Sequence, residues 1–568
     1  MENCFNQYQR EISDIISIQN LLSNLNEASL ESTIESIKSS KFIQNPVNLK
    51  IIIKIIGRII KYRRKQIKCF FALIDEIFPT ISTSFTKKEI MVLFSQKIIF
   101  LKLLHDKFIT IEDIIEFYGI KCDKIVYFYP EIKDKLSYDS ILKKYDKYKC
   151  IIDYFSDREG QTIDFNEDPR LQAGNIDKLC IFIQNDDIDS FQQMISQNNI
   201  NIRQHKITLT NFEWNKCLNE EVIYLIEYAA YHNSMKIFKF LLMNEAAFSP
   251  KLFLYAVCGG NNEIIHLAEN ALENVDFYSD INSILTLSII FHRNDISDYL
   301  IEKFDIHNFF NQMSTSIYYE NYGFFFKHIL EINDDYNELL AKEDVKCNEI
   351  SELIIFCAGS VSTIPLRIVV NFNDLNLNES LKLQIKRKTM ENDKVTNPLV
   401  YAIQMFNNDN AKLLLSMDSV DPDLKLFYNV TPFIWACYVG NLEMVDILYN
   451  DKKVNASVII EESNENALHI SVRMNNLEVV KFLVSLNIFD LAQKNSQNED
   501  ALQTAARLGY KEIFYFLKEE MSKNGIEIDE NLKINDERFY PTHCRNPLTM
   551  ANDFFGNLKE RISVCILI

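Results

Sequence analysis

The chain has 568 residues, 47% of them apolar and 24% charged, so it is long enough for several domains or a repeat array and too apolar to be disordered. Its net charge is −19, yet residues 1–150 hold 24 lysines and arginines against 18 acidic residues, and the remainder holds 36 against 61. The acidic remainder would repel nucleic acid and anionic membranes, so binding to nucleic acid is not expected there.

Residues 1–150 carry apolar side chains at three- and four-residue spacing, as in "VNLKIIIKIIGRIIKY" and "KEIMVLFSQKIIFLKLL". This spacing predicts an N-terminal domain of helices. Eight basic residues lie within it between positions 50 and 68. Runs of charge usually face water, so we interpret this run as the solvated face of an amphipathic helix. A nuclear-import signal or a polyanion-binding patch is the alternative.

Two features indicate a cytoplasmic protein. The first residues have neither the basic nor the apolar stretch of a signal peptide. The 12 cysteines lie far apart with no C-x-x-C pair, as expected of reduced, mostly buried thiols. The basic run leaves a nuclear location as the alternative. The most apolar segment is interrupted by Lys54 and Arg58, so no segment is expected to span a bilayer.

One pattern recurs in the second half of the chain. Copies begin near Asn397, Thr431, Asn466 and Asp500, and each has an apolar residue at the same slot. These slots are Leu399, Phe433, Leu468 and Leu502, at spacings of 34, 35 and 34 residues. A period near 33 residues predicts a solenoid of helix pairs, in which each pair buries its apolar face against its neighbours.

The residues within one copy resemble those of an ankyrin repeat. Thr431-Pro432 starts the first helix, because proline in the first turn gives up an amide that has no partner. Gly440 and Gly509 supply a left-handed turn between the two helices. Asn475 takes that slot in another copy, and asparagine tolerates it best after glycine. The resemblance implies an all-α fold, with the N-terminal helical domain followed by an ankyrin-repeat α-solenoid.

The copies set the expected domain layout. We expect a helical domain at 1–150, a linker at 151–175, degenerate repeats at 176–330, an irregular or highly degenerate repeat at 331–396, clear repeats at 397–520, and an irregular segment with a C-terminal capping unit at 521–568. Residues 1–150 also resemble the uncharacterised helical module that precedes degenerate ankyrin repeats in protist protein families. That resemblance implies no activity.

The sequence contains no recognised catalytic or cofactor motif. It has no G-x-x-x-x-G-K-[ST], G-x-G-x-x-G, H-E-x-x-H or G-x-S-x-G motif, and its histidines and cysteines do not cluster at metal spacing. His469 occupies an ankyrin slot that implies a hydrogen bond between repeats. We therefore predict no enzyme, cofactor, metal or small-molecule substrate; an enzyme with a diverged motif is the alternative.

Two columns of residues are candidates for binding a protein partner, because the resemblance places them on the concave face of the array. The first contains Tyr401, Trp435, Ile470 and Thr504, and the second contains Gln404, Tyr438, Arg473 and Arg507. Trp, Tyr and Arg are enriched at interaction hot spots. The alternative is that Trp435 and Tyr438 only pack against the next repeat. The predicted function is a scaffold or adaptor whose protein partner is unknown.

A second hypothesis concerns the last four residues. Cys565-Ile566-Leu567-Ile568 matches C-a-a-X, a prenylation signal. The chain would then be a peripheral membrane protein, anchored only through Cys565. The upstream residues are weakly basic, so the second signal that stable anchoring needs is absent there.

Overall fold

The N-terminal helices begin at the caps and prolines of the sequence. In the computed structural model, the Asn45 side chain accepts a hydrogen bond of 2.9 Å from the Val47 amide at the start of α5 (Pro46–Tyr62), with Pro46 in the first turn. Thr86 and Glu89 form a capping box at α7 (Lys87–Phe94). Helix α5 buries most of its isoleucines, and it packs against α2 (Gln9–Ser23), α4 (Lys41–Gln44), α6 (Ile67–Ser84) and α7.

The structure describes residues 2–118, 123–133, 155–156, 165, 168, 170–171, 177–209, 222–272, 281–307, 310–341, 348–372, 375–378, 381–383, 394–426, 429–461, 463–529 and 532–535. The chain divides into two compact units. Unit 1 comprises residues 1–8, 112–125 and 333–561, and unit 2 comprises residues 9–111, 126–332 and 562–568.

The remaining N-terminal elements are short. They are α1 (Glu2–Gln7), α3 (Leu30–Ser39), η1 (Arg64–Gln66), α8 (Lys97–His105), α9 (Ile111–Tyr118), η2 (Asp123–Phe128) and α10 (Tyr129–Ile132).

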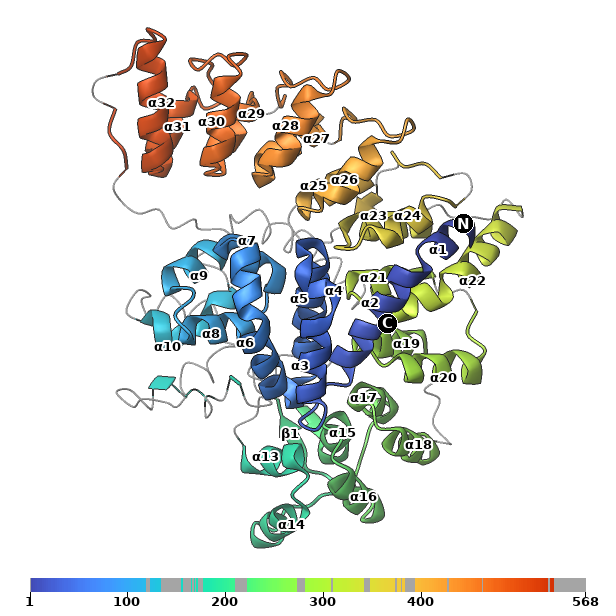
Figure 1. Cartoon of the computed structure of the whole chain (residues 1–568). Helices are drawn as coiled ribbons and strands as arrows, with labels where there is room; N and C mark the ends of the chain where they lie inside the picture. Colours follow the sequence, from blue (N-terminus) through green and yellow to red (C-terminus); the bar gives the residue numbers. More distant parts are fainter. Residues whose placement is uncertain are drawn as a thin grey trace. The chain divides into compact units, whose positions relative to one another are not determined.

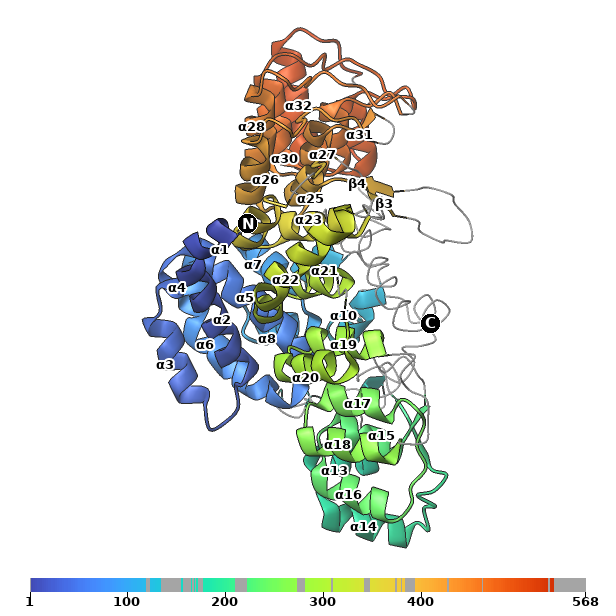
Figure 2. The ribbon, with the colours of Figure 1, turned by 90° about the vertical axis from the view of Figure 1, so that its right-hand side faces the viewer.

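Helix pairs follow from residue 178 onward (Figure 1). The pairs that begin in unit 2 are α13 (Lys178–Asn185) and α14 (Ile188–Gln197), α15 (Leu225–Tyr231) and α16 (Met235–Met243), α17 (Leu252–Gly259) and α18 (Asn262–Ala271), α19 (Ile281–Ile290) and α20 (Asn294–Phe304), and α21 (Phe310–Tyr318) and α22 (Tyr322–Ala341). Figure 2 shows the first three of these pairs following one another.

Unit 1 continues with five more pairs. They are α23 (Asn348–Gly359) and α24 (Ile364–Val369), α25 (Pro398–Gln404) and α26 (Asn408–Leu415), α27 (Pro432–Val439) and α28 (Leu442–Asn450), α29 (Ala467–Arg473) and α30 (Leu477–Ser485), and α31 (Ala501–Leu508) and α32 (Lys511–Lys523). Their first helices stack in chain order, α23 on α25, α25 on α27, α27 on α29 and α29 on α31.

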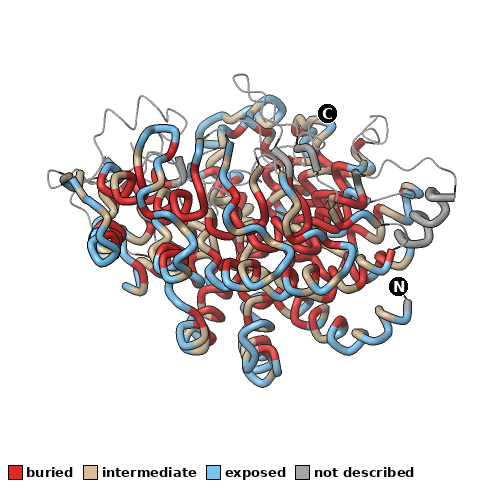
Figure 3. Tube along the Cα trace, turned by 90° about the horizontal axis from the view of Figure 1, so that it is seen from above, coloured by how far each residue is buried: buried red, intermediate tan, exposed pale blue. Residues whose placement is uncertain are grey.

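The predicted all-α class is confirmed. Among the described residues, the strands form two antiparallel pairs, β1 (Lys206–Thr208) with β2 (Val222–Tyr224) and β3 (Leu381–Leu383) with β4 (Lys394–Thr396). Ile207 lies opposite Ile223, and Lys382 opposite Val395. Buried positions run through the helices, and exposed positions occupy many loops and helix ends (Figure 3). None of the helices within the described ranges has the length and apolar character of a membrane span.

Asparagines at the turns between paired helices tie successive repeats together. The Asn476 amide donates to the carbonyls of Cys437 (2.9 Å) and Tyr438 (3.2 Å) at the end of α27. Asn441 donates to the Ile403 carbonyl (3.1 Å) at the end of α25. These bonds satisfy carbonyls that a helix end leaves without an intrahelical partner, so they fix the register between repeats.

The segment expected to be a linker contains a buried ion cluster. Arg170 is buried, and its Nη2 lies 2.6 Å from Asp168 Oδ2 and 2.7 Å from Glu131 Oε1. The Arg170 Nη1 also donates to the Tyr127 carbonyl at 3.0 Å. Arg170 therefore attaches this part of the chain to η2 and α10.

The interpretation of the basic run as a solvated face is only partly right. Lys65 and Lys68 are exposed, but Arg63 is buried. The Arg63 guanidinium donates to the carbonyls of Phe291 and His292 after α19, and these bonds replace the water that a surface arginine would keep. Burial also lowers the pKa of Lys54 to about 8, assisted by the nearby charge of Arg58.

Candidate protein-binding surface

The candidate residues lie on the first helices of four successive repeats, α25, α27, α29 and α31. In each repeat the chain turns into the second helix at a residue with positive φ, namely Phe406, Gly440, Asn475 or Gly509. The residue two positions earlier occupies one equivalent slot, which we call the turn column. In these repeats the turn column consists of Gln404, Tyr438, Arg473 and Arg507.

Two of the six predicted contact residues are buried. Tyr401 is 2% exposed and Gln404 is 1% exposed. Tyr401 packs against the preceding repeat, where a Cβ on Gly359 would lie only 2.2 Å from its ring, and its ring centroid is 6.0 Å from that of Phe356. We therefore correct the prediction: Tyr401 joins its repeat to the preceding one, and both side chains are too buried to present a surface to a partner.

Trp435 and Tyr438 form a half-buried aromatic pair on α27. Their ring centroids are 5.3 Å apart, and the ring planes are inclined by 30°. Burial raises the pKa of the Tyr438 hydroxyl, and the positive charge of Arg473 acts in the opposite direction. The pair therefore presents a rigid aromatic surface that keeps contact with solvent, next to an arginine of the following repeat.

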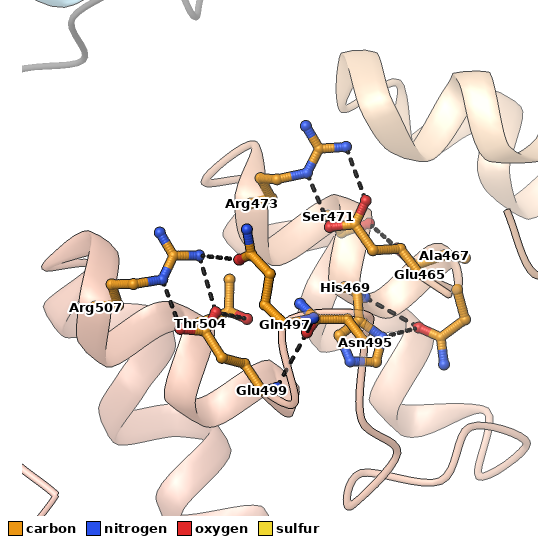
Figure 4. Close-up of polar contacts among 11 residues, drawn as sticks. Glu465, Ala467, His469, Ser471, Arg473, Asn495, Gln497, Glu499, Thr504 and Arg507 are labelled. Carbon is orange, nitrogen blue, oxygen red and sulfur yellow. Dashed lines mark hydrogen bonds and ion pairs between the residues drawn. The ribbon is translucent and has the colours of Figure 1, made fainter. Parts of the chain in front are cut away.

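Arg473 and Arg507 are held by glutamates of their own repeats (Figure 4). The Nε and Nη2 atoms of Arg473 donate to both Glu465 oxygens at 3.0 and 3.1 Å. The Nε and Nη2 atoms of Arg507 donate to both Glu499 oxygens at 2.7 and 2.9 Å. This hydrogen bonding raises the pKa of Arg507. The arginine side chains are still 41% and 46% exposed.

Sequence reasoning missed the two glutamates. It named the arginines only as candidate contact residues, whereas each forms a two-bond ion pair that compensates its charge. The signal was present, because "ENALHISVR" and "EDALQTAAR" both place a glutamate eight residues before the arginine. The surface on α29 and α31 therefore offers oriented guanidinium groups with little net charge.

His469 forms the hydrogen bond between repeats that its slot implies, so this prediction is confirmed. Its Nδ1 lies 2.8 Å from Asn466 Oδ1, and its Nε2 lies 3.0 Å from the Gln493 carbonyl, which precedes the next repeat. Burial lowers the pKa of the imidazole. An imidazole held in place through contacts at both ring nitrogens has a structural role.

The described residues contain no group of three His, Cys, Asp or Glu side chains that could hold a metal ion. Cys357 and Cys437 are free and buried, and burial raises the pKa of both thiols, which disfavours the thiolate needed for nucleophilic chemistry. The predicted C-terminal capping unit and Cys565 lie outside the described residues.

The last two described repeats match a known family. A family model described as ankyrin repeats (3 copies) matches residues 455–531, which include α29 to α32. No curated protein matches the chain. The matched segment contains the helix pairs, the turn asparagines and the His469 bond described above. Ankyrin repeats are modules of protein–protein interaction, and residues 455–531 of the chain are therefore identified as ankyrin repeats.

Proposed function

We propose that the chain is a non-enzymatic scaffold or adaptor that binds a protein partner on the concave face of its repeats. The observation that carries this proposal is the surface formed by Trp435, Tyr438, Arg473 and Arg507. It joins a half-buried aromatic pair to two oriented arginines on three successive repeats. Large aromatic side chains and arginines are the groups that contribute most to binding energy at interfaces.

The ion pairs of Arg473 and Arg507 favour partner binding because they hold the guanidinium groups in one orientation. A flexible arginine loses side-chain entropy when a partner immobilises it. Glu465 and Glu499 already hold the two guanidinium groups, so part of that entropy has been lost before binding. The pairs use the Nε and Nη2 atoms, and the remaining edge of each guanidinium can donate to carbonyl or carboxylate groups of a partner.

Affinity purification with the full chain tests the proposal. Tyr438→Ala, Arg473→Ala and Arg507→Ala are combined in one variant, and Lys481→Ala on α30 is the control, because Lys481 pairs only locally with Glu478 at 2.8 Å. Circular dichroism checks that both variants stay folded. We expect the triple variant to lose at least one partner that the wild type and the control retain. Equal recovery of every partner would reject this surface.

We also propose a cytoplasmic location. It is supported by free, buried Cys69, Cys357 and Cys437, since exposed or paired cysteines are more typical of secreted chains. Cell fractionation tests this proposal, and the same experiment with Cys565→Ser tests the lipid anchor expected from the C-terminal sequence. A wild-type protein found in the membrane fraction, and released by Cys565→Ser, would replace the cytoplasmic proposal with the anchored one.

A further inference from the structure

The turn column also exists in the repeats of unit 2. There the turn residues with positive φ are Asn233, Gly260, His292 and Glu320. Two positions earlier, the turn column consists of Tyr231, Cys258, Ile290 and Tyr318. In α15, α17, α19 and α21 the column is thus apolar and aromatic, whereas in α29 and α31 it carries arginine.

The end of helix α5 packs against this part of the turn column. Tyr62 belongs to one buried cluster with Cys258 and Ile290, and Tyr231 and Tyr318 pack against the same cluster. One turn earlier on α5, the Arg58 guanidinium lies 5.0 Å above the centre of the Tyr318 ring, within the range of a cation–π interaction. The end of one helix of the N-terminal domain therefore shares a cluster with residues of four successive repeats.

Polar bonds fix the helix at this position. Arg63 Nε and Nη2 donate to the Phe291 carbonyl at 3.1 and 3.0 Å, and Nη2 also donates to the His292 carbonyl at 2.7 Å. From α2, the Gln19 amide nitrogen donates to Asn321 Oδ1 at 2.7 Å, and its oxygen accepts from the Gly323 amide at 2.9 Å. All these acceptors and donors lie at the turns of the repeats.

The composition of this contact is that of an interface between proteins. Beside Leu254, Leu287, Ile290 and Phe291, the contact contains four tyrosines, buried arginine and hydrogen-bonded side-chain amides, whereas a domain core is mainly aliphatic. The contact also places two cations, Arg63 and Arg293, close together. Burial is the main cause that lowers the pKa of Arg63, and the charge of Arg293 lowers it further. The carboxylate of Asp295 acts in the opposite direction on the pKa of Arg63, and the hydrogen bonds that hold the guanidinium run to backbone carbonyls. A buried cation held in this way gives a weaker contact than apolar packing of the same size, so this contact is easier to exchange than the packing inside each repeat.

We propose that α5 is an intramolecular ligand for the turn column of α15 to α21, and that its displacement opens a second protein-binding site for an amphipathic helix of the same chemistry. The required chemistry follows from α5. Lys54, Arg58 and Tyr62 are spaced by four residues, which places them along one stripe of the helix. Lys54 donates to the Val92 carbonyl of α7 at 3.4 Å, whereas Arg58 and Tyr62 contact the column. The site therefore takes helices that present an arginine and, one turn later, an aromatic residue.

This site differs from the surface at Trp435, because it lies on other repeats and takes a basic helix. While α5 is attached to the same chain, its effective concentration at the column is in the millimolar range, which excludes most free helices. A partner helix gains access when the hold of α5 is weakened. Binding at this site does not require that the surface at Trp435 binds a partner.

A peptide tests the site directly. The probe is a fluorescent peptide of residues 46–66 with a solubilising glycol tail, titrated into the full chain and followed by anisotropy. We expect Arg58→Ala combined with Arg63→Ala to bind the probe at least 10-fold more tightly than the wild type. The control Lys68→Ala removes an exposed charge of the same run and should behave as the wild type. Adding Tyr318→Ala to the double variant should weaken binding about 10-fold.

Hydrogen exchange on the same full-length proteins distinguishes a ligand from a core helix. In the double variant we expect amides of 287–293 and 316–324 to exchange about 10- to 100-fold faster, as expected when charged hydrogen bonds are lost. The amides of α13 and α14 should keep their wild-type rates. Faster exchange throughout α13 to α18 would show that α5 is part of the core and would overturn the proposal. So would a probe that binds neither protein.

Discussion

The hydrogen bonds between repeats predict a measurable loss of stability in Asn476→Ala. The Asn476 amide donates to two carbonyls of the preceding repeat, at 2.9 and 3.2 Å. It makes no capping bond to its own helix, so the substitution removes only the connection between repeats. Each neutral hydrogen bond contributes about 1 kcal/mol net, so the two bonds predict that the free energy of unfolding falls by about 2 kcal/mol.

The chain offers a local probe for this measurement. It contains two tryptophans, so Trp214→Phe leaves Trp435, on the helix that receives the Asn476 bonds, as the only tryptophan. Urea unfolding followed by its fluorescence should show a midpoint lower by about 1 M, for a denaturant dependence of about 2 kcal/mol per molar. Asn450→Ala is the matched control, since Asn450 bonds only to Asp446 in its own helix. A midpoint equal to that of the control would refute the reasoning.

Three further predictions concern a turn glycine, a buried histidine and an ion pair. Gly440→Ala should lower the free energy of unfolding by about 1–2 kcal/mol in the fluorescence assay, because Gly440 has φ 78° and a Cβ would lie 2.6 Å from Asn476 Oδ1. Burial, followed by a nearby arginine charge, lowers the pKa of His292 from 6.5 to about 3. Unit 2 should therefore lose stability as the pH falls from 6.5 towards 3, by about 2 kcal/mol at pH 5, and His292→Gln should flatten this dependence in hydrogen exchange. Glu465→Gln should change stability by less than about 1 kcal/mol, since Arg473 is partly exposed; a larger change in the urea midpoint would mean that the pair has a structural role.

The regular features of the repeats could be predicted from the sequence. Thr431, Pro432 and Gly440 give local signals for a helix start and a left-handed turn, and the structure has both, with φ 78° at Gly440. The turn at Phe406 also has a positive φ, 57°, although phenylalanine gives no such signal. Its conformation is imposed by the helices on either side, so only the repeat period indicates it.

The candidate surface was harder to predict, because exposure depends on neighbouring repeats. Tyr401 occupies the same slot as Trp435, yet it is buried, because Gly359 in the preceding repeat has no side chain to keep the ring away. That contact joins residues more than 40 positions apart, in a stretch where the period is weak. Arg473 and Glu465, in contrast, are eight residues apart in a clear repeat, and their pairing could have been inferred from the matching spacing of Arg507 and Glu499.

The side chains of the turn column explain why α5 lies on the repeats of unit 2. The column residues there are uncharged, and Tyr318 accepts the Arg58 cation above its ring. The equivalent slots on α29 and α31 hold Arg473 and Arg507, whose charges are compensated by Glu465 and Glu499, so they offer the arginine of a basic helix no aromatic ring to pack on. A site that lacks the matching group discriminates against a ligand that needs it. We therefore expect the peptide of residues 46–66 to bind the exposed column of unit 2 and to leave binding at Arg473 unchanged. In the variant that combines Arg58→Ala and Arg63→Ala, the later repeats should recover their partners at the wild-type level. Loss of those partners in that variant would show that the two parts of the column do not act separately.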